Sequence, residues 1–86
     1  MNAIDQKVVI TYPVQWSYRL VGKDHEAIQQ TIAQVMQERE HKVSLSNTSS
    51  TGKFVSYSCE LLIMNDEERL FFYEEFKRQE AVLYLL

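Results

Sequence analysis

The amino-acid sequence predicts an α+β domain, because four segments alternate their side chains with the period of a strand and two others have the spacing of an amphipathic helix. The clearest strand is the run FVSYSCELLIM, whose one side is apolar and whose other side is mainly serine. In chain order the segments read βαββαβ. Their simplest packing is a ferredoxin-like sandwich, a four-stranded antiparallel sheet in the order 4-1-3-2 with both helices on one face.

The first half of the chain supplies an arm, a strand and a helix. We predict residues 1–12 to be an N-terminal arm and residues 13–86 to be one ferredoxin-like domain, because Pro13 disfavours helix in the residue before it. The run WSYRLVG predicts a strand that ends at Gly22. Asp24 is a typical helix cap, and it precedes a predicted helix over about residues 25–40, whose apolar face consists of Ile28, Ile32, Val35 and Met36.

The second half supplies a hairpin, a helix and a last strand. The run KVSLSNTSS predicts a polar edge strand, and the turn at 49–53, with Gly52, joins it to the serine-rich strand. Asn65 and Glu68 form a capping-box pattern at the start of a second helix. That helix turns Phe72, Tyr73 and Phe76 to one side and leaves Leu70 and Phe71 on the other. The ending AVLYLL predicts the fourth strand, with Leu83 and Leu85 on the open face of the sheet.

Composition narrows the classes of function. With 9 Lys and Arg against 12 Asp and Glu, the formal net charge of −3 has the wrong sign for binding a nucleic-acid backbone. The single cysteine, Cys59, cannot form an internal disulfide, and no apolar run approaches the ~20 residues of a membrane helix. We therefore predict a cytoplasmic protein without a membrane partner.

No residue pattern points to catalysis, a metal or a cofactor, and we predict none of the three. A copper carrier needs two thiolates close together, whereas Cys59 is alone and lies on the inward side of its strand. An acylphosphatase-like enzyme needs a cradle of backbone amides and an arginine, which the loop after the first strand does not provide. That loop is the candidate ligand loop of a regulatory domain, with His25 also interpretable as a residue at the edge of the core: Gly22, Lys23, Asp24 and His25.

The open sheet face is the main candidate interaction surface. Its predicted residues are Ser17, Arg19, Phe54, Ser56, Ser58 and Glu60, and we expect Arg19 to lie opposite Glu60. The alternative is a solvated face without a partner. RNA recognition would require several exposed aromatic residues there, and the pattern provides only Phe54. Four exposed apolar residues complete the candidate surface: Leu70, Phe71, Leu83 and Leu85.

Four segments together resemble the YbeD-like family of small uncharacterised bacterial proteins: WSYRLVG, SSTGKFVSYSCELL, FYEEF and AVLYLL. The resemblance covers about residues 12–86. It implies a ferredoxin-like fold similar to ACT regulatory domains and a family with no assigned catalytic activity. The chain departs from the family pattern at Thr51, where a basic residue is common, and at Leu70 and Phe71, where polar residues are expected.

These observations predict a small non-catalytic regulatory or protein-interaction module with a protein partner, which a second copy of the chain could itself supply. Two alternatives remain open. One is a regulatory domain that binds a small metabolite in the candidate ligand loop, and the other is a module that binds single-stranded RNA on the open face.

Overall fold

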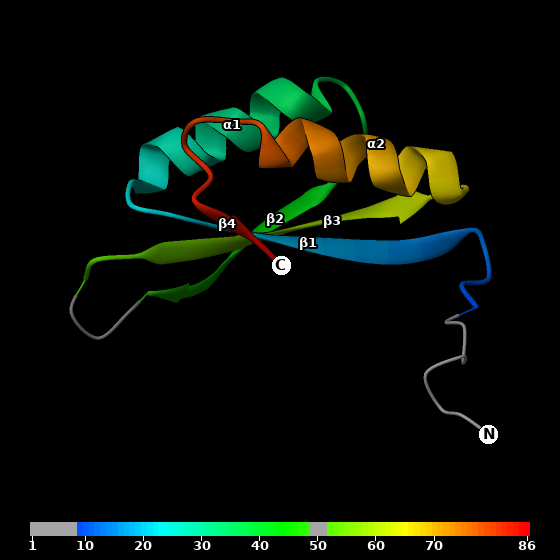
Figure 1. Ribbon diagram of the computed structural model, residues 1–86, viewed down its shortest axis with the longest axis horizontal. Helices are drawn as coiled ribbons and strands as arrows, with labels where there is room; N and C mark the ends of the chain where they lie inside the picture. The colour runs from blue at the N-terminus through cyan, green and yellow to red at the C-terminus, as the bar shows by residue number, and fades with distance from the viewer. Residues whose placement is uncertain (1–8, 49–51) are drawn as a thin grey trace.

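The computed structural model describes residues 9–48 and 52–86, and their elements follow the predicted order (Figure 1). The elements are β1 (Val14–Gly22), α1 (His25–Met36), β2 (Lys42–Thr48), β3 (Val55–Ile63), α2 (Asp66–Lys77) and β4 (Tyr84–Leu85). The described strands form one four-stranded sheet in the order β2-β3-β1-β4. This is the predicted order read from the other edge, so the ferredoxin-like topology is confirmed. Figure 1 shows both helices on one side of the sheet.

The first helix is shorter than its predicted range of 25–40. The side chain of Asp24 caps it by accepting hydrogen bonds from the backbone N–H groups of Glu26 and Ala27, at 2.8 and 3.2 Å. Helical backbone ends at Met36, because Gln37 has a φ of 53° and donates its N–H to the carbonyl oxygen of Ala33. No apolar residue follows Met36 to extend the buried stripe, so nothing holds residues 37–40 against the sheet as helix.

The second helix begins with the predicted cap. Asn65 accepts a hydrogen bond from the N–H of Glu68 at 2.8 Å, and the Glu68 carboxylate accepts one from the N–H of Met64 at 2.9 Å. The acidic residues of the first turn and Lys77 in the last turn suit the helix dipole. This is the reciprocal capping that the sequence predicts, except that the Glu68 carboxylate binds the N–H of Met64 instead of the N–H of the cap residue Asn65.

The core lies between the helices and the sheet. Its buried residues come from the inward faces of β1, β3, α1 and α2, with Val82 beside them: Tyr18, Leu20, Ile28, Ile32, Met36, Val55, Tyr57, Cys59, Leu61, Ile63, Phe72, Phe76 and Val82. Trp16, Val35 and Tyr73 are partly buried against this core, as is Tyr12 from the end of the predicted arm. Residues 1–8 of that arm lie outside the described residues.

The register of β1 and β3 differs from the expected one. The core pairs Tyr18 with Cys59 and Leu20 with Tyr57, which places Arg19 opposite Ser58 and Ser17 opposite Glu60. The predicted pairing of Arg19 with Glu60 is therefore wrong, because the register is shifted by two residues along β3. Alternation fixes which face a side chain occupies, but only packing of the core pairs fixes the register.

The fourth strand is much shorter than the predicted 81–86. A turn brings the N–H of Val82 to the carbonyl oxygen of Gln79. In β4, Tyr84 lies opposite Val21 and Leu85 opposite Leu20, and backbone hydrogen bonds to β1 continue from Leu83 to Val21 and between Leu86 and Arg19. Because Leu20 is buried, Leu85 packs on the core side, and its predicted place on the open face is wrong. Leu83 is 45% exposed and lies beside Tyr73 and Lys77 at the sheet edge, not on the open face.

The β2–β3 hairpin is confirmed, and β2 is an edge strand as predicted. Its inward side chains Val43 and Leu45 stay 39% and 55% exposed, because the helices do not extend over this edge. Gly52 has a φ of 75°, the left-handed conformation that the turn was expected to need. Ser49, Ser50 and Thr51, which the prediction places in the same turn, lie outside the described residues.

Candidate functional site

The register of β1 and β3 brings their predicted surface residues together on the open face. This is the side of the sheet opposite the helices (Figure 1). Ser17 and Arg19 come from β1, and Ser56, Ser58 and Glu60 come from β3. Ser58 lies between Arg19 on β1 and Ser44 on β2, and its Oγ shares a hydrogen bond of 2.8 Å with the Oγ of Ser46. The open face therefore carries a row of hydroxyl groups next to a guanidinium group.

Ser56 is the exceptional member of this row. Its neighbours Val55 and Tyr57 face the core, so its side chain points to the open face, yet Ser56 is only 8% exposed. Its Oγ has no hydrogen-bond partner among the described residues. A buried hydroxyl left without a partner costs about 1–3 kcal/mol. The open face thus contains a polar group whose hydrogen-bonding capacity the described part of the chain does not use.

Tyr84 is an open-face residue that the sequence reasoning missed. It is 60% exposed and lies opposite Val21, and its ring packs edge to face against that of Phe54 at a centroid distance of 6.4 Å. The run AVLYLL is apolar in both phases, so alternation did not tell Tyr84 from its neighbours. The one available signal was the hydroxyl of Tyr84, which favours the wetter side of a strand.

The candidate ligand loop has mainly structural contacts. Gly22 is buried, and a Cβ atom there would lie 2.4 Å from the carbonyl oxygen of Ala81 and 2.6 Å from Cδ1 of Ile28. Asp24 caps α1, and Nδ1 of His25 lies 2.7 Å from the hydroxyl of Tyr57. Lys23 is exposed and has no such contact among the described residues. A metabolite site in this loop stays a prediction.

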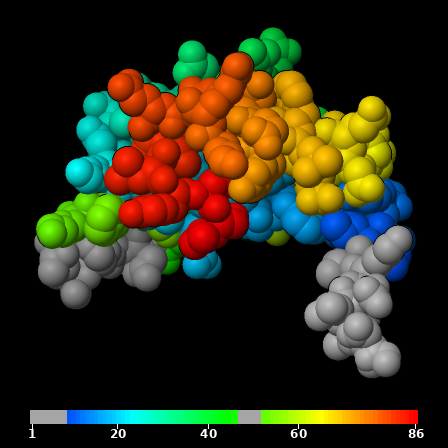
Figure 2. Space-filling model, in the orientation of Figure 1, coloured from blue at the N-terminus to red at the C-terminus, as the bar shows by residue number. Residues whose placement is uncertain are grey.

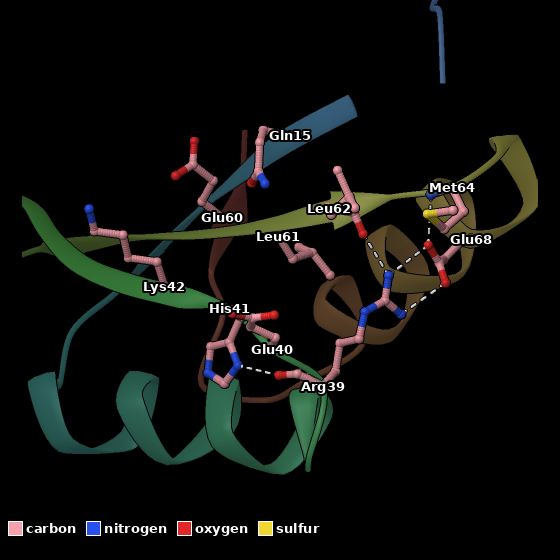
Figure 3. Close-up of a pocket in the computed structure, with 10 residues that line it drawn as sticks. All are labelled: Gln15, Arg39, Glu40, His41, Lys42, Glu60, Leu61, Leu62, Met64 and Glu68. Atoms are coloured by element: carbon pink, nitrogen blue, oxygen red, sulfur yellow. Dashed lines mark hydrogen bonds and ion pairs between the residues drawn. The ribbon is translucent and has the colours of Figure 1, made fainter. Parts of the chain in front are cut away.

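A cavity of about 670 Å³, lined by charged residues together with Leu61, Leu62 and Met64, lies where β3 continues past the start of β2 (Figure 3). At its centre Arg39 donates two hydrogen bonds of 2.8 Å to the Glu68 carboxylate and one of 2.6 Å to the carbonyl oxygen of Leu62. The hydrogen bond from Arg39 lowers the pKa of Glu68, and the same bond raises the pKa of Arg39. Arg39 falls inside the predicted helix over residues 25–40, so the sequence did not predict this cluster.

The predicted exposure of Leu70 and Phe71 is confirmed, at 50% and 56%. Phe71 stands at the rim of a groove of about 440 Å³ between the end of α1 and the face of α2, and its ring lies 5.3 Å from that of the buried Phe72. Val35 and Met36 of α1 also line the groove. The groove thus joins Phe71 to apolar residues of α1, with polar residues between and around them, among them Gln37, Glu75 and Arg78.

A second, smaller groove of about 250 Å³ lies between α2 and the C-terminal residues. Figure 2 shows these residues, in red, directly against α2, in orange. Leu83 and Tyr84 line the groove on one side and Tyr73 and Lys77 on the other. Leu83 therefore belongs to an apolar edge of the molecule, separate from Leu70 and Phe71.

Cys59 is a core thiol, as predicted. It is fully buried, and burial raises the pKa of the thiol to about 12. Within residues 9–48 and 52–86, no group of three or more His, Cys, Asp and Glu residues could hold a metal ion. No helix in the same part of the chain combines the length and the apolar character needed to cross a membrane.

Comparison with known proteins identifies relatives without an assigned activity. A family described as "protein of unknown function (DUF493)" matches residues 7–86. An uncharacterised protein of Campylobacter jejuni is 28% identical over 68 residues, which are 79% of this chain and 78% of that protein. An uncharacterised protein of Helicobacter pylori is 28% identical over 82 residues, 94% of each chain.

Solved structures share the fold. The solution structure of a Helicobacter pylori protein superposes with a TM-score of 0.80 at 24% identity, over all of this chain and 94% of that one. The ACT domain from the GTP pyrophosphokinase of Chlorobium tepidum superposes with a TM-score of 0.60 at 11% identity, over 84% of this chain and 94% of that one. At these identities the likeness concerns the fold alone.

Proposed function

This chain belongs to the DUF493 family of proteins of unknown function, and on that premise we propose that it is a non-catalytic regulatory module that docks a partner protein on its helix layer. The membership confirms the resemblance to the YbeD-like family that the sequence motifs indicate. The fold is the one expected from that resemblance, because an ACT domain superposes on most of the chain. The fold fixes the shape of the module, whereas the proposal rests on its surface.

The observation that carries the proposal is the exposed ring of Phe71 at the rim of a groove with both apolar and polar lining residues. Leu70 and Phe71 each leave about half of their surface in water, although Phe72, the next residue, is buried. Apolar patches next to a groove are typical of protein interfaces, and aromatic residues supply much of the binding energy there. The family resemblance leads us to expect polar residues at both positions, which supports a partner particular to this protein.

Charge around the patch indicates the chemistry of the partner. Glu67 and Glu74 are exposed on α2, and Glu38 is exposed just beyond α1. Arg78, the nearest base on the groove, is paired with Glu75 at 3.0 Å. A segment that inserts an apolar side chain beside Phe71 and carries Lys or Arg at its flanks would complement this surface. We therefore propose a partner with a basic amphipathic segment.

Phe71→Lys is expected to weaken binding of the partner at least tenfold, because it replaces the apolar anchor with a charge that repels the basic flanks. The partner is first captured on the immobilised chain and identified by mass spectrometry, and the affinity of the purified pair is then measured by calorimetry. Leu45→Lys is the matched control, since Leu45 is 55% exposed but lies on β2, away from the helix groove.

Equal affinities of the wild-type chain and the Phe71→Lys variant would contradict this docking surface. A melting curve of each variant separates lost binding from lost folding, and both substitutions are at exposed positions, where effects on stability are small. A partner that binds Phe71→Lys normally but fails to bind Leu45→Lys would move the interface to the β2 edge.

Two finer parts of the proposal concern location and self-association. We propose a cytoplasmic location, because the free thiol of Cys59 suits a reducing compartment. Pairing of two copies through the exposed Leu83 and the edge of β4 stays a prediction. With only Tyr84 and Leu85 in that strand, such a dimer would depend on side-chain packing more than on backbone pairing.

A further inference from the structure

The open face combines three kinds of group that the proposed docking surface does not use. Arg19 is exposed and forms no ion pair among the described residues. The rings of Tyr84 and Phe54 pack against each other two positions further along the same face. On the neighbouring β3, Ser58 lies opposite Arg19 and Ser56 lies opposite Val21. A cation, an aromatic pair and hydroxyl groups therefore lie within a few residues of each other.

The register of the sheet fixes the relative positions of these groups. Tyr84 lies opposite Val21, and Val21 lies opposite Ser56, so the tyrosine, the valine and the serine form one row across three strands. Arg19 and Ser58 form the next row on the same face. Rows on one face are about 6.6 Å apart and neighbouring strands about 4.8 Å apart. The distance from a ring beside Tyr84 to an anion at Arg19 would thus match the distance from the base to the phosphate within one nucleotide.

The charges of the open face limit the ligand to a small anion. Lys42 lies opposite Glu60 across β2 and β3, so their formal charges cancel. Among the described open-face side chains of β1, β2 and β3, Arg19 is then the one charge without an opposite charge across the strands. On its other side lies Leu86, which exchanges two backbone hydrogen bonds with Arg19, at 3.1 and 2.9 Å. A chain of phosphates would need several cations in a row and would meet Glu60 and the overall charge of −3. One anionic group fits this face, whereas a polyanion does not.

We propose that the open face binds a free mononucleotide, with the base stacked on Tyr84 beside Phe54 and the phosphate held by Arg19. The guanidinium group suits a phosphate because it offers paired N–H donors in one plane. The hydroxyl groups of Ser58 and Ser17 lie next to Arg19 and donate to the remaining phosphate oxygens.

The test is a titration of the ¹⁵N-labelled chain with AMP, CMP, GMP and UMP, followed by two-dimensional NMR at low salt. We expect the amide resonances of Arg19, Ser58 and Tyr84 to move in at least one titration. Arg19→Gln and Tyr84→Ala should each weaken binding roughly tenfold, since each removes one of the two anchors. Arg78→Gln is the matched control, because Arg78 is an exposed arginine on the helix layer and its loss should leave binding unchanged.

Adenosine and ribose 5-phosphate, tested separately, should each bind more weakly than AMP, because each keeps only one anchor. The proposal is overturned if no mononucleotide moves these resonances up to about 10 mM, a range that includes millimolar affinities. It is also overturned if Arg19→Gln binds as well as the wild type. Binding of an oligonucleotide alone, with a salt dependence of several phosphates, would assign the face to RNA instead.

The same titration on Phe71→Lys separates this inference from the docking surface. Phe71 lies on the helix layer, so mononucleotide binding should be unchanged in that variant. Loss of partner binding with normal nucleotide binding leaves both proposals in place, whereas a normal partner affinity without nucleotide binding removes only the present one.

Discussion

At the scale of single residues, Gly22 has the most demanding position in the fold. It ends β1, where a Cβ atom would meet the carbonyl oxygen of Ala81 from the C-terminal turn and Cδ1 of Ile28 from α1. Three parts of the chain therefore meet at the one residue without a side chain. The sequence predicts Gly22 to be a turn residue and a ligand-loop candidate, but only the tertiary structure brings Ala81 close to it.

Gly22→Ala is expected to lower the free energy of unfolding by about 1–3 kcal/mol, because the added methyl group overpacks a site whose nearest neighbour is backbone. Urea denaturation followed by circular dichroism measures the loss. The double variant Gly22→Ala/Ile28→Val should lose less than the sum of the two single losses, since Ile28→Val removes Cδ1 from the crowded site. A Gly22→Ala variant as stable as the wild type would contradict the close contact.

At the scale of elements, the Arg39–Glu68 pair links the segment between α1 and β2, which contains Arg39, to the first turn of α2, which contains Glu68. The guanidinium group binds both oxygens of Glu68 and also the carbonyl oxygen of Leu62, at the end of β3 that β2 does not cover. It also lies 5.4 Å above the ring of Phe72. The Arg39 side chain thus connects the segment after α1 to β3 and to α2. It can reach both because α1 ends before Arg39.

Glu68→Gln is expected to destabilise the chain by about 1 kcal/mol at pH 7, because it removes the charge from a bidentate but partly exposed pair. Arg39 lowers the pKa of Glu68 in the folded state, so this stabilisation is present above the unfolded pKa of the carboxyl group. It is lost as pH falls through the lower, folded pKa. Urea denaturation at pH 7 and pH 3 should show a larger difference between variant and wild type at pH 7 than at pH 3.

Glu75→Gln is the control for this prediction, because Glu75 pairs with Arg78, whose side chain is 70% exposed. Its effect should be smaller at pH 7. Arg39→Lys should not restore the stability of Arg39→Ala, since an ammonium group cannot bind two carboxylate oxygens and a carbonyl oxygen in one plane. Full rescue by lysine would show that charge alone, without the bidentate geometry, holds the connection.

At the scale of the whole molecule, the helices cover only one face of the sheet and leave the other face to the solvent. The core is therefore a single layer, and it contains two acidic groups that stay neutral. Burial raises the pKa of Tyr18 from 10.0 to about 12 and that of Cys59 from 9.0 to about 12. The Tyr18 hydroxyl also donates a hydrogen bond of 2.6 Å to the carbonyl oxygen of Arg69, which requires its proton.

Stability should fall as pH rises from about 9 to 12, because the unfolded chain releases the protons of Cys59 and Tyr18 in this range while the folded chain keeps them. Each unit of difference in pKa corresponds to roughly 1.4 kcal/mol. Denaturation in urea at a series of alkaline pH values measures the slope. Cys59→Ala should flatten the slope near pH 9–10, and an unchanged slope would contradict a buried neutral thiol.

The order of the elements, the helix caps and the buried faces were predictable from the sequence, since all depend on neighbours within a few positions. Asp24 and Asn65 cap the helices that were expected, and Ile28, Ile32, Phe72 and Phe76 are buried as their spacing predicts. The family match agrees with the motifs that indicated it.

The predictions that were wrong concern positions decided by distant parts of the chain. Arg19 faces Ser58 instead of Glu60 because the core pairs set the register. Leu85 turns inward because β4 starts only at Tyr84, after a turn that a uniformly apolar ending does not reveal. Local periodicity thus determined which side of each helix and strand is apolar, and hence the fold of this protein. Only tertiary packing decided which of them meet, because register, strand ends and the Arg39 cluster are set by contacts between segments far apart in sequence.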